Sequence, residues 1–114
     1  MAGRSPIRRV LFVCHQNRRR SATAERLFAK RADLEVRSAG TSEEALARVN
    51  SRMLEWADLI FVMEDRQRDA LEQMFPDNAA LERVVCLQIP DEYRFLDGEL
   101  VRLLQERVAP YLNS

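Results

Sequence analysis

The residues most able to do chemistry form one short run, residues 14–21, with the sequence Cys-His-Gln-Asn-Arg-Arg-Arg-Ser. The apolar run before it, residues 10–13, is typical of a buried parallel strand, and residues 22–31 have the spacing of an amphipathic helix. The amides of a tight loop and the N-terminus of a helix direct positive charge toward one point. The run therefore predicts a cysteine nucleophile that faces an oxyanion site.

Four residues of this run have a defined chemical use. Cys14 attacks well only as the thiolate, which a helix N-terminus and nearby arginines favour. Arg20 carries a planar guanidinium that can bind two phosphoryl oxygens. Ser21 can donate a hydrogen bond to the sulfur, and the amide of Asn17 can bridge groups on both sides of the loop. Phosphoryl transfer requires mainly positioning and charge stabilisation, so these residues indicate that chemistry.

Residues 10–25 resemble the signature of the low-molecular-weight protein tyrosine phosphatases, and residues 37–41 and 57–64 agree with the same family. The resemblance implies a phosphomonoesterase that hydrolyses phosphotyrosine or a similar phosphate ester through a phosphocysteine intermediate. It implies that residues 15–21 form the phosphate-binding loop between Cys14 and the helix. It also implies that Ser38 supports the loop asparagine, although Ser38 could equally satisfy the local backbone.

A departing oxygen needs a proton, and residues 90–93, Pro-Asp-Glu-Tyr, follow the fourth predicted strand. They are similar to the Asp-Pro-Tyr motif of the family except at its middle residue. We expect Asp91 to be the general acid, with a solvated turn carboxylate as the alternative interpretation. Asp97 fits a helix cap better, Glu92 is a weaker rival, and Tyr93 could pack on a substrate ring.

The other loop residues leave alternatives open. Arg18 and Arg19 could be charges at the substrate rim, nucleic-acid contacts or solvated side chains. His15 is the only histidine, so it supports no metal cluster, and it is expected to line the mouth or modulate the thiolate. The family usually has glycine at the position of Gln16, which predicts mild backbone strain or an altered cradle there. Cys86 is expected to be inert core.

The segment between Gly40 and Asp58 is short compared with the family, in which the longer stretch carries one wall of the cleft and a histidine. A shallower site is expected, and phosphotyrosine, phosphoarginine and small anionic phosphate esters all stay possible substrates. Two other functions stay open: an inactive phosphoprotein-binding module, and an arsenate reductase, for which Cys86 is badly placed. A nucleic-acid binder is a third alternative, and only the three adjacent arginines support it.

The composition is that of a small folded domain. The chain has 114 residues, of which 46% are apolar and 32% charged, so we predict a leader over residues 1–6 and one domain over residues 7–114. Basic and acidic residues number 18 each, which implies no general attraction to nucleic acid or membrane. Two cysteines fit a reducing cytoplasm. No cofactor is expected, the expected partner is a phosphorylated protein or small phosphate ester, and the oligomeric state is not indicated.

Predicted strands and helices alternate along the chain. The strands are residues 8–14, 35–38, 59–63 and 83–88, and the helices include residues 20–31, a helix that ends before Pro76, and a last helix capped by Asp97. Gly40 is expected to permit a tight turn before a helix that begins with a capping box from Thr41 to Glu44 and buries Leu46. The alternation predicts a three-layer α/β fold, a four-stranded parallel sheet with helices on both faces. Cys14 lies at the carboxyl end of its strand, where active sites of such sheets form.

Overall fold

The computed structural model of the chain describes residues 8–112, so the leader predicted for residues 1–6 lies outside the described part. Strands and helices alternate in the predicted order. They are β1 (Arg8–Cys14), α1 (Arg20–Phe28), β2 (Leu34–Gly40), α2 (Ser51–Trp56), β3 (Leu59–Val62), α3 (Asp65–Met74), a short 3-10 helix (Ala79–Arg83), β4 (Val84–Cys86) and α4 (Gly98–Leu112).

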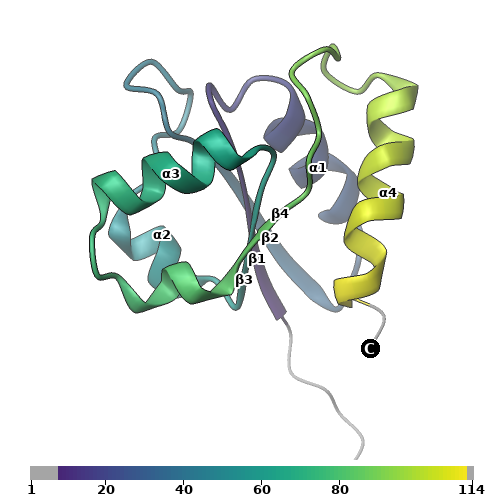
Figure 1. Cartoon of the computed structure of the whole chain (residues 1–114). Coiled ribbons are helices and arrows are strands. Elements are labelled where there is room, and N and C mark those ends of the chain that lie inside the picture. The colour runs from purple at the N-terminus through teal and green to yellow at the C-terminus, as the bar shows by residue number, and fades with distance from the viewer. Residues whose placement is uncertain (1–7, 113–114) are drawn as a thin grey trace, which may run out of the picture.

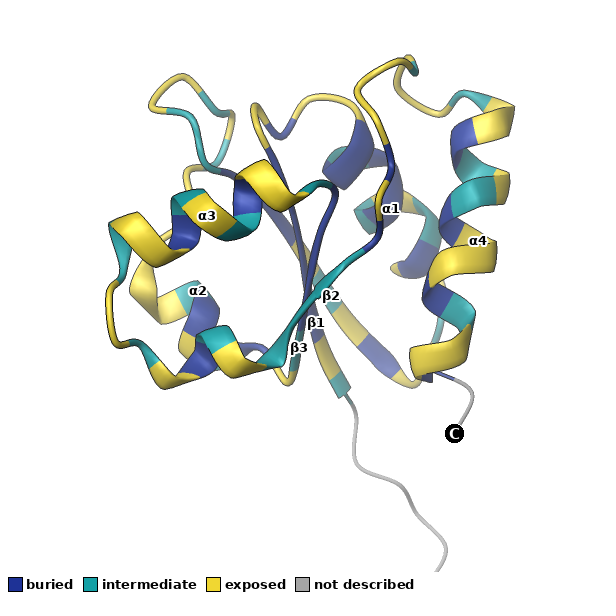
Figure 2. Ribbon diagram, viewed as in Figure 1, coloured by how far each residue is buried: buried dark blue, intermediate teal, exposed yellow. Residues whose placement is uncertain are grey.

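The four strands form one parallel sheet in the order β2-β1-β3-β4, with β1 inside it. Helices α2 and α3 cover one face, and α1 and α4 cover the other (Figure 1). Val10 and Phe12 of β1 pack with α1 and α4, whereas Leu11 and Val13 pack with α2 and α3. Both faces of β1 are thus buried (Figure 2), which is why the strand reads as a continuous apolar run. The predicted three-layer α/β fold is confirmed.

Helices α2 and α4 begin at side-chain caps. The Oδ1 atom of Asp97 accepts a hydrogen bond from the Glu99 amide at 2.8 Å, so the predicted cap of α4 is present. The Oδ1 atom of Asn50 accepts from the Met53 amide at 2.9 Å and caps α2. This second cap explains why α2 begins well after the start that the sequence predicted.

The helix predicted to begin at Thr41 does not form, and residues 41–49 are turns instead. The backbone amides of Thr41, Ser42 and Leu46 donate hydrogen bonds to carbonyl oxygens of the loop after β1, at 3.0, 2.9 and 3.1 Å. A helix that begins at Thr41 needs the Leu46 amide to bond the Ser42 carbonyl, but this amide donates to the Gln16 carbonyl instead. The capping-box prediction was therefore wrong, and Leu46, which was expected to be buried, is 66% exposed.

Other boundaries differ by a few residues. The first helix ends at Phe28 rather than Arg31, because the Arg31 amide donates to the Phe28 carbonyl in a turn that leads into β2. β2 is longer than predicted, and β4 covers only three residues.

Among residues 8–112, no helix has both the length and the apolar character that crossing a membrane requires.

Candidate active site

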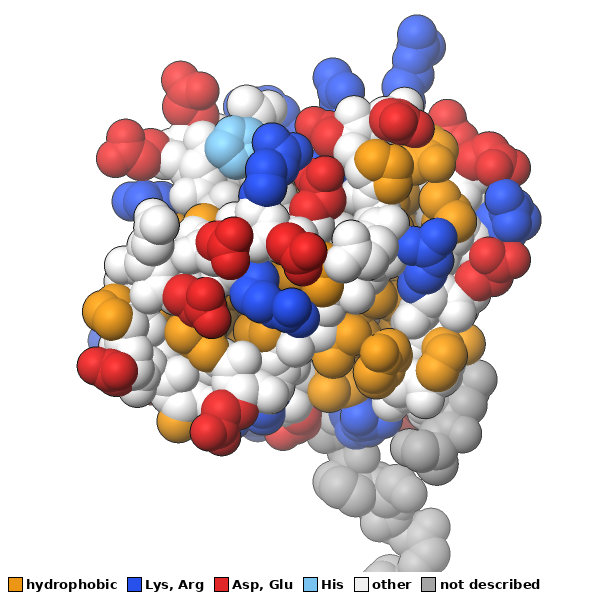
Figure 3. Space-filling model, viewed as in Figure 1, with side chains coloured by type: hydrophobic (Ala, Val, Ile, Leu, Met, Phe, Trp, Pro, Cys, Tyr) orange, Lys and Arg blue, Asp and Glu red, His pale blue; other side chains and the backbone are white. Residues whose placement is uncertain are grey.

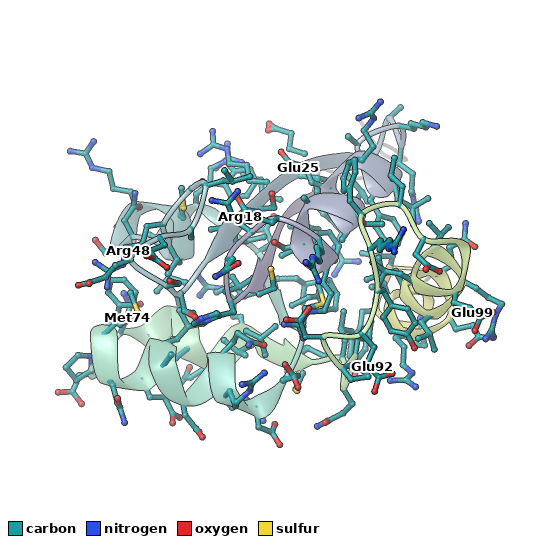
Figure 4. All side chains as sticks on the ribbon, turned by 90° about the horizontal axis from the view of Figure 1, so that it is seen from above. Arg18, Glu25, Arg48, Met74, Glu92 and Glu99 are labelled. Carbon is teal, nitrogen blue, oxygen red and sulfur yellow. The ribbon has the colours of Figure 1, made fainter. Side chains whose placement is uncertain are left out.

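Cys14 is the last residue of β1, and α1 begins at Arg20, so the predicted phosphate loop connects the carboxyl end of an inner strand to a helix N-terminus. Figure 4 looks down on this edge of the sheet, with Arg18 on the loop and Glu92 on the segment after β4 facing it from the other side. A cavity of about 160 Å³ opens here. Its walls are formed by Cys14, His15, Gln16, Arg18, Arg19, Arg20 and Asp91.

The backbone of the loop is oriented by the turns of residues 41–46. The carbonyl oxygens of Cys14, His15 and Gln16 accept the hydrogen bonds from those turns and so point away from the cavity. In a trans peptide the carbonyl and the next N–H point in opposite directions, and no cis peptide occurs within the described residues. The next three amides, ending with that of Asn17, therefore face the concave side. The Asn17 amide donates to Cys14 Sγ at 3.2 Å, as this orientation requires.

Asn17 fixes the loop through its side chain. Its Nδ2 atom donates to the hydroxyl oxygens of Ser21 and Ser38, both at 2.8 Å. The contacts are to side chains of α1 and β2 rather than to the backbone, and the support expected from Ser38 is present in the structure. The Ser38 hydroxyl in turn donates to the carboxylate of Glu25 on α1. Glu25 was quoted as part of the family signature but was given no role from the sequence.

The hydroxyl of Ser21 lies 3.0 Å from Cys14 Sγ. Because the Ser21 oxygen accepts a hydrogen bond from the side-chain amide of Asn17, the hydroxyl hydrogen of Ser21 is available to another acceptor. The Ala39 carbonyl is the other acceptor in reach, at the longer distance of 3.4 Å. The sulfur can therefore accept hydrogen bonds from Asn17 and Ser21 together, an arrangement that stabilises a thiolate.

The backbone strain predicted at Gln16 is not found. Gln16 has an ordinary φ, and the left-handed conformation falls on Asn17, whose φ is 58°. Asparagine adopts this conformation more readily than most residues, so the loop forms without a glycine at residue 16.

Gly40 is needed for close packing rather than for a special backbone angle. It is the β2 partner of Cys14, and a Cβ atom on it would lie 2.5 Å from the His15 carbonyl oxygen, 2.7 Å from Ala45 Cβ and 3.0 Å from the Asn17 amide nitrogen. The predicted tight turn is thus only part of its use. The absence of a side chain lets the phosphate loop lie directly on the end of β2.

The guanidinium of Arg20 is almost completely buried, at 1% exposure. Its Nη1 atom donates to Glu64 Oε1 at 2.7 Å and to the Ile89 carbonyl at 2.8 Å. Its Nε atom lies 3.7 Å from Asp91 Oδ1, beyond hydrogen-bonding distance. No fully buried polar side-chain atom within residues 8–112 lacks a partner, so Nε and Nη2 reach open space at the cavity. These two nitrogens form one edge of the guanidinium, and this edge can bind two oxygens of an oxyanion.

Glu64 holds this arginine in place, and its role was missed from the sequence. Burial alone raises the pKa of Glu64, but hydrogen bonds from Arg66, at 2.9 Å, and from Arg20 outweigh it and hold the pKa below its usual value. The position of Glu64 in the sequence could have indicated this role, because Glu64 follows β3 closely and so lies at the same sheet edge as Cys14. A buried arginine that ends in this cavity needs such a carboxylate.

The loop after β4 brings one carboxylate to the cavity. Asp91 lines it, with a side chain that is 48% exposed. Glu92 is exposed and is not among the lining residues, and Asp97 is occupied as the cap of α4. Tyr93 packs against the core between the sheet, α1 and α4, so the structure does not bring it to the cavity. Cys86 is also outside it, and burial raises the pKa of its thiol.

Comparison with known proteins agrees with this geometry. A model of the low molecular weight phosphotyrosine protein phosphatase family matches residues 9–56, from β1 through α2. The predicted resemblance to that family is confirmed. The family is one of phosphatases, which are hydrolases, and its matched region includes the whole phosphate loop with Cys14, Asn17, Arg20 and Ser21. No curated protein matched the chain.

Solved structures extend the likeness to the second half of the chain. The tyrosine phosphatase amsI of Erwinia amylovora is 20% identical with a TM-score of 0.76, over 96% of this chain and 93% of that one. Vibrio vulnificus Wzb, solved with benzylphosphonate, is 25% identical with a TM-score of 0.74, over 94% and 98%. The YwlE arginine phosphatase of Geobacillus stearothermophilus is 22% identical with a TM-score of 0.73, over 93% of each. The shared fold therefore includes phosphatases named for two different substrates.

Proposed function

We propose that this protein is a cysteine-dependent phosphomonoesterase that acts on a phosphorylated protein or a small phosphate ester through a phosphocysteine intermediate. The observation that carries the proposal is the meeting of three groups at one cavity. The nucleophile Cys14, the unbonded edge of the Arg20 guanidinium and the carboxylate of Asp91 all line it. A binding module would use the arginine for an anion but has no need of a carboxylate beside it.

In the first step the Cys14 thiolate attacks phosphorus in line with the ester oxygen. The S–P bond forms as the P–O bond breaks, and Asp91 gives its proton to the departing oxygen. The inward-facing amides after Cys14, together with Nε and Nη2 of Arg20, bind the equatorial oxygens as charge develops on them. Their positions are fixed before substrate arrives, because the loop carbonyls are already bonded to residues 41–46.

In the second step water attacks the phosphocysteine. Asp91, now a carboxylate, takes a proton from that water, the S–P bond breaks, and phosphate leaves with the bonding electrons returned to sulfur. The Asn17 amide and the Ser21 hydroxyl stabilise the departing thiolate. Each residue thus ends the cycle in its starting protonation state.

Replacing Cys14 with Ser tests the proposal. The wild type is expected to hydrolyse p-nitrophenyl phosphate at mildly acidic pH, and the Cys14→Ser variant is expected to lose turnover while still binding inorganic phosphate or vanadate. Trapping of phosphate on Cys14 during turnover, detected by rapid quench and mass spectrometry, would identify the intermediate. Hydrolysis that persists in the Cys14→Ser variant would reject the mechanism, and a wild type that binds vanadate without any turnover would favour the binding module.

A further inference from the structure

The rim of the cavity points to the chemical class of the substrate. Building on the proposed function, we infer that the site prefers phosphate monoesters that carry a second anionic group close to the scissile phosphate. Arg18 and Arg19 would bind this second group, while Arg20 and the loop amides hold the phosphoryl group.

Apart from Cys14, every residue that lines the cavity has a polar or charged side chain. The residues beyond the phosphoryl position are His15, Gln16, Arg18 and Arg19, and all four are exposed. No aromatic or aliphatic side chain within residues 8–112 is among the lining residues. A site that selects an aryl ring buries it against apolar side chains. The side chain best placed for that by sequence, Tyr93, packs into the core instead.

Within residues 8–112, the charges of Arg18 and Arg19 have no partner. Neither side chain forms an ion pair or hydrogen bond with any residue in the part of the chain that the structure describes. Several other exposed arginines do pair with carboxylates, among them Arg31, Arg66 and Arg102. Two free guanidinium groups at the mouth of a cavity are therefore available to a ligand.

Nearby carboxylates do not cancel this charge. Glu64 is bonded to Arg20 and Arg66, and the proposed role of Asp91 is to be protonated when substrate reacts. Acidic and basic side chains are mixed over the face of the molecule in Figure 3, in keeping with the zero net charge, so the positive excess is local to the loop. A guanidinium leaving group would meet the same positive rim and be disfavoured, whereas a carboxylate or second phosphate would be favoured.

A matched pair of substrates tests the inference. The compounds are 3-carboxyphenyl phosphate and 3-carbamoylphenyl phosphate, which have similar shape and leaving group but differ by one negative charge. In the wild type kcat/KM is expected to be about 3- to 10-fold higher for the carboxylate, the size of one or two partly exposed ion pairs. Raising the salt concentration should reduce this ratio, because the contacts are solvent-accessible.

Charge-removing variants assign the preference to the rim. In Arg18→Gln/Arg19→Gln the ratio is expected to fall to about one, since no ion pair to the second group remains. The control Arg26→Gln/Arg52→Gln removes two exposed arginines that do not line the cavity, and it should keep the wild-type ratio. A ratio near one in the wild type, or a ratio unchanged in Arg18→Gln/Arg19→Gln, would overturn the inference.

A binding measurement separates this inference from the proposed function. Cys14→Ser does not consume the compounds, so calorimetry can compare its affinity for the same pair. If the wild type has no phosphatase activity but Cys14→Ser binds the carboxylate compound more tightly, the proposed function fails and the anion preference stands. If the wild type is active but neither kinetics nor binding distinguishes the pair, the preference fails and the proposed function stands. Phosphopeptides with glutamate or lysine beside the phosphorylated residue then distinguish a protein substrate from a small one.

Discussion

The carboxylate of Glu25 accepts a hydrogen bond from the Ser38 hydroxyl, and this contact begins the chain of side-chain hydrogen bonds that leads to the nucleophile. Because Ser38 donates to Glu25, its oxygen accepts from Asn17 Nδ2. The other Nδ2 hydrogen goes to Ser21, which leaves the Ser21 hydroxyl free to donate to Cys14 Sγ. A carboxylate one turn further along α1 than Ser21 is thus connected to the sulfur through three side chains.

We predict that Glu25→Ala weakens the stabilisation of the Cys14 thiolate without touching the cavity. Without its acceptor, the Ser38 hydroxyl can donate elsewhere and the network loses its fixed direction. The rate of Cys14 alkylation by iodoacetamide at mildly acidic pH should fall about 3- to 10-fold, the effect of about 1 kcal/mol for one hydrogen bond, and kcat should fall in parallel. Glu55→Ala, an exposed residue of α2, serves as the control. Equal alkylation rates in the wild type and Glu25→Ala would show that the network does not reach the sulfur.

The contact between Arg20 and Glu64 predicts a pH-dependent stability. The folded pKa of Glu64 lies below its usual value, so its stabilising contribution is complete above the unfolded pKa and is lost as the pH falls through the folded one. Glu64→Gln should lower the free energy of unfolding by about 1–3 kcal/mol at about pH 7, because a charge-assisted bond to a buried arginine is lost. At about pH 3, below the usual pKa of a glutamate, the difference from the wild type should be smaller, because the contribution of the ionised carboxylate is declining there.

Chemical denaturation of both proteins at the two pH values measures this effect. A destabilisation that is the same at both would mean that the ionised state of Glu64 contributes nothing and that only packing is lost. The same variant should bind inorganic phosphate less tightly, because Arg20 then loses the charged partner that holds its guanidinium in place beside the Ile89 carbonyl.

The role of Asp91 predicts a dependence on the leaving group. Asp91→Asn cannot supply a proton, so its kcat/KM for phenyl phosphate should fall by about 100-fold or more, whereas p-nitrophenyl phosphate, which leaves without a proton, should lose less than about 10-fold. Glu92→Gln is the matched control, since Glu92 is the next residue and is not among the lining residues. Equal losses on the two substrates in Asp91→Asn would reject the assignment, and a larger leaving-group effect in Glu92→Gln would transfer the role to Glu92.

The sequence predicted the fold and the phosphate loop because both depend on local order along the chain. The apolar run of β1, the loop and the start of α1 are contiguous, and their spacing alone brings Cys14 and Arg20 together. The Asp97 cap is local in the same sense. Each of these features could be read from neighbouring residues without knowing which distant segments meet.

The features that the sequence did not reveal depend on contacts between distant segments. Thr41 to Glu44 has a good capping pattern, yet the Leu46 amide, which a helix from Thr41 would need, donates to Gln16 in the loop after β1. Glu64 acts through Arg20, which lies on another element, and Tyr93 turns into the core rather than toward the cavity. Local propensity is outweighed wherever a buried polar group elsewhere requires a partner.

The packing of the loop on Gly40 gives a last prediction, with a control in the same chain. A Cβ at residue 40 would lie 2.5 Å from the backbone oxygen of His15, and a backbone atom cannot move aside as a flexible side chain would. Gly40→Ala should therefore destabilise the protein by about 1–3 kcal/mol and displace the loop. Gly98→Ala has nothing within 4 Å of the added atom and begins α4, so it should be neutral or stabilising by about 0.4–1 kcal/mol.

Thermal unfolding measures the change in stability, and the affinity for phosphate or vanadate measures the displacement of the loop. Gly40→Ala should lose oxyanion affinity at temperatures where it is still folded, because the His15 carbonyl oxygen and the Asn17 amide nitrogen flank the added methyl group. Gly98→Ala should keep the wild-type affinity. If Gly40→Ala is destabilised but binds oxyanion normally, then β2 shifts instead of the loop. Oxyanion binding would in that case not depend on the contact between Gly40 and the loop.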